Sequence, residues 1–194
     1  MDSVRRPFEM PVLHTTPDDF GLSCPEANRR KLELLVTAPY RVLHDDGAVL
    51  LGLAVSSGLG ELFLCKMDEF ALTYYLRFEV KQINQLGSTA ARVALWRRCS
   101  PGLEGGTSRI LHSLLNEYDA VVSDPSITIA GQRYWIDRMA EAHQKGLTVG
   151  VVDGDIPVPY KGRHLLDWIQ TQDGGGREER YGGKPFFVAK KLVG

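Results

Sequence analysis

The stretch VALWRRCSPGLEGGTSRILHSLL, residues 93–115, decides the fold prediction. It predicts a strand at residues 93–96, a glycine-rich turn, and then a helix whose apolar side chains repeat at helical spacing. Glycines leave backbone N–H groups unobstructed, Thr107 or Ser108 can cap the helix, and a helix N-terminus carries unpaired donors and positive potential. This arrangement predicts a place for a phosphate or pyrophosphate group, although a plain connecting turn has a similar composition.

The residues that follow alternate between strand and helix. The sequence predicts a buried strand at residues 120–123, a helix from about residue 129 that ends near Lys145-Gly146, and a β-branched strand at residues 147–152. Strands joined through helices imply right-handed crossovers and partly parallel pairing. A short helix near residues 165–169 and a last strand at 184–191 follow, on either side of a glycine-rich polar loop.

The residues before the quoted stretch predict strands that pair with their neighbours in sequence. Apolar runs at residues 40–44 and 48–55 flank a turn at residues 45–47, where Gly47 can adopt the positive φ of a tight hairpin. Another strand is expected at residues 60–65. An antiparallel first half that continues into strand–helix alternation predicts an α+β fold with a mixed, mostly antiparallel central sheet flanked by helices.

The chain of 194 residues fits one domain, predicted at residues 40–194 after an N-terminal arm and short helix at residues 1–39. Lys and Arg number 23 and Asp and Glu 24, so a net charge of −1 predicts no general attraction to nucleic acid or to an anionic membrane.

Three widely spaced cysteines with no metal-ligand spacing are read as free buried thiols: Cys24, Cys65 and Cys99. No stretch approaches the roughly 18 apolar residues of a membrane span, and the charged N-terminal residues do not resemble a secretory signal. A cytoplasmic protein is therefore expected.

The second half resembles the GNAT superfamily of acetyl-CoA-dependent N-acyltransferases. The likeness covers roughly residues 40–155 plus the last strand, and rests on the order strand, glycine-rich turn, helix, strand, helix, strand. Residues 96–98, 122–124 and 131–135 look most similar to small GNAT-like proteins encoded by bacteriophages, which implies a host cytoplasm or a virion as the location.

The resemblance implies acetyl-CoA as donor substrate. Residues 98–108 would cradle its pyrophosphate, the strand at residues 93–96 would pair with its pantetheine arm, and Tyr134 would protonate the departing thiolate. Asp124, directly after the predicted strand at residues 120–123, is the second candidate catalytic residue, as a contact to the substrate amine; here the sequence departs from the family, which usually has Asn at the end of this strand. The implied donor-binding residues are Val93, Leu95, Arg97, Arg98, Gly102, Gly105, Gly106, Thr107 and Ser108.

Several of these residues have a structural alternative. Tyr134, beside Trp135 on an apolar helix face, also fits a core residue. Asp124 and Thr128 also fit the start of the second helix, whose N–H groups could donate to their side chains. Glu61 and the pair Asp68-Glu69 can face a substrate amine or lie on solvated surface.

Two functions remain open at this point. One is a GNAT-like N-acyltransferase. The other is a non-catalytic GNAT-fold phage protein that acts as a binding or virion component, with residues 1–25 docking on a protein partner. Glu104 favours the second function, because it places a carboxylate inside the proposed anion cradle.

Overall fold

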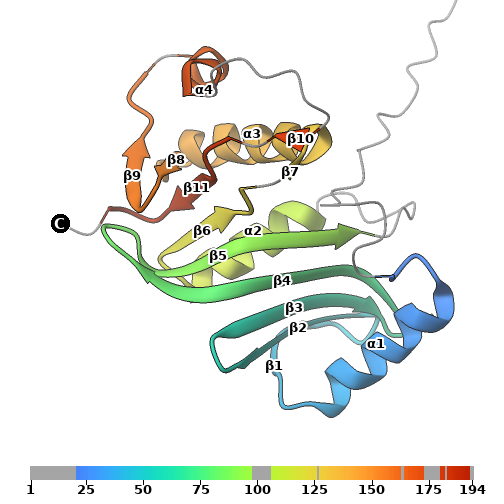
Figure 1. Ribbon diagram of the computed structural model, residues 1–194. Helices are drawn as coiled ribbons and strands as arrows, with labels where there is room; N and C mark the ends of the chain where they lie inside the picture. The colour runs from blue at the N-terminus through green and yellow to red at the C-terminus, as the bar shows by residue number, and fades with distance from the viewer. Residues whose placement is uncertain are drawn as a thin grey trace, which may run out of the picture.

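The computed structural model describes residues 21–97, 106–125, 127–162, 164–172, 180–181 and 183–192. Within them the chain forms a nine-stranded mixed sheet and a separate two-stranded sheet, accompanied by four helices (Figure 1). The α+β class and the mixed, mostly antiparallel sheet are confirmed. No helix of the described part is long and apolar enough to cross a membrane.

The large sheet has the strand order β1-β2-β3-β4-β5-β6-β11-β8-β9, and the small one pairs β10 with β7. The strands are β1 (Arg41–Asp45), β2 (Val49–Ser56), β3 (Leu59–Lys66), β4 (Ala71–Ile83), β5 (Gly87–Arg97), β6 (Ala120–Ser123), β7 (Ile127–Thr128), β8 (Thr148–Asp153), β9 (Ile156–Pro159), β10 (Arg180–Tyr181) and β11 (Phe186–Ala189).

Antiparallel neighbours build the first half of the sheet, and tight turns connect them. The first predicted turn is confirmed, because Gly47 has a φ of 82° and the Asp46 carboxylate accepts hydrogen bonds from the N–H groups of Ala48 and Val49. These bonds lower the pKa of Asp46.

The second half follows the predicted crossovers. Helix α2 (Gly106–Glu117) connects β5 to β6, which pair in parallel, and helix α3 (Ile129–Gln144) leads toward β8. Strand β11 lies between β6 and β8 and is antiparallel to both. All four of its residues are buried, so this strand belongs to the centre of the fold.

Helices cover both faces of the sheet (Figure 1). Leu51, Leu62 and Leu64 face the cluster formed with α2, α3 and α4 (Leu165–Gln172). The alternate residues Leu50 and Phe63 face α1 (Pro25–Thr37) instead, because successive side chains of a strand point to opposite faces. The arrangement leaves the carboxyl ends of β5 and β6 next to the two crossover helices.

Both edges of the large sheet carry features that oppose pairing with another strand. Strand β1 has a register irregularity between Val42 and His44 where it pairs with β2. Strand β9 contains Pro157 and Pro159, and proline within a sheet is found mainly at edges because it has no N–H to donate.

The structure corrects the sequence predictions at several places. Strand β4, the longest, was not predicted, and neither were the short strands β7, β9 and β10. Cys24 is exposed at the start of α1, so it is not a buried thiol, whereas Cys65 is buried and its burial raises the pKa of the thiol to about 11. Cys99 lies outside the described residues.

Candidate functional site

The candidate site lies where the parallel pairing of β5 and β6 stops. The two strands pair at Thr89 with Ala120, Ala90 with Val121, and finally Val93 with Ser123. Strand β5 continues to Arg97 and stays paired with β4 on its other side. Among the described strands, none pairs with residues 94–97 on the β6 side.

A bulge at Arg92 accompanies this separation. From Ala90 to Val93, three steps of β5 face two steps of β6, and the register with β4 shifts at the same place. Arg92 has a φ of 52°, an uncommon conformation for a residue with a side chain, at a cost of roughly 1–3 kcal/mol. Bulges bend the strand that carries them, which explains why β5 leaves β6.

Strand β6 ends because Ser123 bonds to its surroundings through its side chain. The buried hydroxyl donates to the carbonyl of Asp124 at 3.1 Å and accepts from the N–H of Phe186 at 2.9 Å. Asp124 follows directly and is partly buried. Because β7 lies between Asp124 and α3, Asp124 does not start that helix. Thr128, the other residue of the predicted capping alternative, directly precedes α3. Asp124 lies instead at the carboxyl end of β6. It is beside the place where residues 94–97 of β5 have no described partner on the β6 side, which is called the gap below.

Tyr134 projects from the first half of α3. Its ring packs edge-on against Trp135 with centroids 6.0 Å apart, and the guanidinium of Arg138 lies 5.7 Å from its centroid. Tyr74 acts on it electrostatically, and Tyr74 pairs across the β4–β5 ladder with Arg97. Tyr134 packs against the main hydrophobic cluster, which also contains Tyr74 and Val93. Burial raises the pKa of its phenol, opposed by Arg138, so the hydroxyl keeps its proton.

The structure places only part of the predicted donor site. Leu95 and Arg97 occupy the separated end of β5, and Val93 is the last paired residue. Gly106, Thr107 and Ser108 form the first turn of α2. The helix starts before Thr107 and Ser108, so the prediction that one of them caps it is wrong. Outside the described residues lie Arg98, Gly102, Glu104 and Gly105.

Glu61 is occupied by contacts on the other face of the sheet. Lys31 of α1 donates to its carboxylate at 2.6 Å, and the hydroxyl of Tyr75 donates to the same oxygen. Burial works to raise the pKa of Glu61, but these hydrogen bonds outweigh it and the pKa lies below its ordinary value. Burial and the same contact raise the pKa of Tyr75. This carboxylate attaches α1 to the sheet rather than facing a substrate.

We expect Glu61→Gln to lower the free energy of unfolding by about 1–3 kcal/mol at pH 7. A carboxyl group whose pKa is lowered by folding stabilises above its ordinary pKa of 4.5 and loses this contribution as the pH falls through the folded-state pKa. The difference from wild type should therefore shrink below pH 4.5, as measured by urea denaturation. Glu33→Gln, at an exposed position of α1, should change stability by less than about 0.5 kcal/mol. An equal Glu61→Gln effect at pH 3 and pH 7 would contradict this assignment.

Asp68 and Glu69 lie in the turn between β3 and β4, where the Asp68 carboxylate accepts from the Glu69 N–H and Glu69 pairs with Lys66 at 3.0 Å. Within the described residues, no group of three or more His, Cys, Asp or Glu side chains is placed to hold a metal ion.

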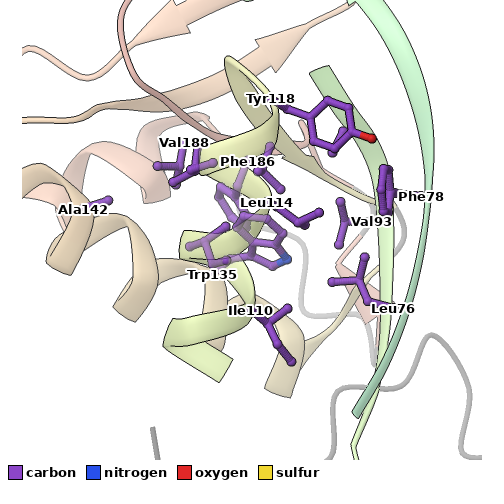
Figure 2. Close-up of a cluster of buried hydrophobic side chains, with 14 of the residues drawn as sticks. Leu76, Phe78, Val93, Ile110, Leu114, Tyr118, Trp135, Ala142, Phe186 and Val188 are labelled. Atoms are coloured by element: carbon purple, nitrogen blue, oxygen red, sulfur yellow. The ribbon is translucent and has the colours of Figure 1, made fainter. Parts of the chain in front are cut away.

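Sequence reasoning missed two features of the site. The bulge at Arg92 has no sequence signal, because arginine is not a residue type that favours positive φ. Trp135 was treated only as a neighbour of Tyr134, yet it lies between α2 and the end of β5 (Figure 2). An apolar position on a helix predicts burial, but it does not predict which strand the side chain will lie against.

Comparison of the chain with protein-family models, with curated proteins and with solved structures found no match.

Proposed function

We propose that this protein is a GNAT-like N-acyltransferase that moves an acetyl group from acetyl-CoA to an amine. The observation that carries the proposal is the end of β5–β6 pairing at Val93 and Ser123 while β5 continues to Arg97. In open sheets with parallel strands, ligands bind at the carboxyl ends of the strands, next to crossover helices. The gap has that position.

Each part of an acyl-CoA has a complementary group near this gap. The backbone of residues 94–97, which no described strand pairs on the β6 side, can pair with the amides of a pantetheine arm as a neighbouring strand would. The amino end of α2 follows β5 and offers N–H donors and positive potential to a pyrophosphate.

The proposed chemistry assigns Tyr134 the last proton transfer. The amine nitrogen attacks the thioester carbonyl carbon, the new C–N bond forms, and the C–S bond breaks. Tyr134 gives its proton to the departing sulfur, and the nitrogen loses one proton to water or to Asp124 beside the gap. The raised pKa keeps Tyr134 protonated at neutral pH, which is the state a proton donor starts from, and it also makes this phenol a weaker acid than an exposed tyrosine.

The strand order supports the same proposal. A β-strand, crossover helix, parallel strand, second helix and further strand occur here in the order of the resemblance, and β11 lies between β6 and β8. The alternative, a GNAT-fold phage protein with a binding or virion role, depends on residues 1–25 and Glu104, most of which lie outside the described residues.

Acetyl-CoA should raise the melting temperature of the protein. A ligand at 100 times its dissociation constant adds about 2.7 kcal/mol to the stability of the state that binds it. Differential scanning fluorimetry with acetyl-CoA, with ATP as the control polyanion, should give a shift for acetyl-CoA only. No shift at millimolar acetyl-CoA would contradict the acyltransferase proposal and favour the alternative, while equal shifts would indicate a general anion site.

A further inference from the structure

Trp135 is a buried aromatic residue that lies on the α2 side of strands β4 and β5, near the start of the gap (Figure 2). It is 4% exposed and belongs to the main hydrophobic cluster. Figure 2 shows its indole between α2, near Ile110 and Leu114, and the strands β4 and β5. The nitrogen-bearing edge of the ring points toward the strands, on the side of Val93 and Leu76.

The indole N–H of Trp135 has no protein partner among the described residues. No hydrogen bond from its nitrogen occurs within the part of the chain that the structure describes. An indole N–H can only donate, and buried tryptophans usually find an acceptor for it. The indole nitrogen is not among the fully buried polar atoms that lack a partner, so solvent reaches it, and a ligand that enters from outside the chain can reach it as well.

The direction of this N–H coincides with the start of the gap. Val93 is the last residue of β5 that pairs with β6, and Leu76 pairs with Leu95, two residues further along β5. The indole edge thus faces the level at which β5 loses its parallel neighbour. A ligand lying along residues 94–97 would bring its inner end to this level.

We propose that the indole N–H of Trp135 donates a hydrogen bond to the carbonyl oxygen of the acyl thioester. This inference rests on the proposed function, because it takes an acyl-CoA as the occupant of the gap. A thioester carbonyl is an acceptor without a proton of its own, which matches a group that can only donate. Trp135 is then a binding residue that recognises the acyl carbonyl.

Two ligands that differ in this oxygen test the inference. Acetyl-CoA carries the carbonyl, and S-ethyl-CoA is a thioether of the same length without it. In ¹H–¹⁵N spectra, the indole signal of Trp135, assigned through Trp135→Phe, should move downfield with acetyl-CoA and stay near its free position with S-ethyl-CoA. The indole of Trp168, a residue of α4 whose ring packs on Tyr160, serves as the internal reference.

Affinities measured by calorimetry give a second readout. Trp135→Phe should weaken acetyl-CoA binding about tenfold, or about 1.4 kcal/mol, and S-ethyl-CoA binding by less than about twofold. Trp168→Phe should leave both affinities unchanged.

The possible results separate this inference from the proposed function. If both ligands bind but move the Trp135 signal equally, or if Trp135→Phe weakens both equally, the residue acts through packing alone and the inference is wrong. If neither ligand binds, the acyltransferase proposal fails and this inference with it. Should Trp135→Phe not fold, Trp96→Phe and Trp168→Phe assign the other two indole signals, so the Trp135 signal follows by elimination and the wild-type spectra still decide.

Discussion

Asn28→Leu should lower the free energy of unfolding by about 3–5 kcal/mol, the largest loss of stability expected from one substitution outside the main cluster. The Asn28 amide nitrogen donates to the carbonyls of Leu22 at 3.3 Å and Leu72 at 3.1 Å, and its oxygen accepts from the Leu72 N–H at 2.8 Å. The residue is 4% exposed. Leucine has a similar size, so it fills the space but leaves these three backbone groups without a partner.

Urea denaturation with tryptophan fluorescence measures this loss. Glu33→Leu provides the matched control, because Glu33 lies on the same helix at an exposed position and should change stability by less than about 0.5 kcal/mol. If Asn28→Leu costs less than about 1 kcal/mol, then α1 is not fixed to β4 through this side chain.

Tyr134→Phe should reduce the rate of acetyl transfer by about a hundredfold, the lower end of what general acids contribute. The substitution removes only the hydroxyl, so acetyl-CoA affinity should change little and the loss should appear in kcat. Release of the CoA thiol, followed with a thiol reagent and a lysine-bearing peptide as the amine, measures the rate.

Tyr118→Phe is the control for this experiment. Tyr118 follows α2 at the end opposite Ile110 in the same buried cluster (Figure 2), and burial raises its pKa as well. The rate of acetyl transfer by the Tyr118→Phe variant should stay within about twofold of the wild-type rate. Because the pKa of Tyr134 is raised above its ordinary value of 10, the wild-type rate should not fall from tyrosine ionisation below pH 10. Equal rates for Tyr134→Phe and Tyr118→Phe would show that Tyr134 serves the core alone.

Elements with a single strong pattern could be predicted from the sequence. The apolar run at Ala120–Ser123 forms β6 with the predicted bounds, and Gly146 ends the region of α3 with a φ of 80°. In both places one local cause decides the structure: continuous burial for the strand, and the left-handed conformation that glycine adopts without strain.

Strand β4 shows why other elements could not be predicted. Residues 72–76 are all buried because both faces of the strand are covered, one by α1 and the other by the main cluster. A strand buried on both faces does not alternate, and a short apolar run does not distinguish strand from helix. The exposed Arg77 and the charges beyond it give the second half of β4 a different pattern.

The candidate site was predictable in its location and not in its geometry. The order of elements predicted crossovers with partly parallel pairing, and the structure confirms that β5 and β6 are parallel neighbours. The bulge at Arg92 and the direction of the Trp135 indole depend on packing between segments far apart in sequence. Such contacts leave no local signal.

The central position of β11 has a consequence for how this protein forms during synthesis. Strands β6 and β8 leave the ribosome well before β11, yet each needs β11 as its partner. Until Phe186–Ala189 inserts, both strands expose backbone edges and apolar side chains, a state that invites aggregation. We infer that this half of the sheet closes after translation of its last strand, while the hairpins β1 to β5 can form as soon as they emerge.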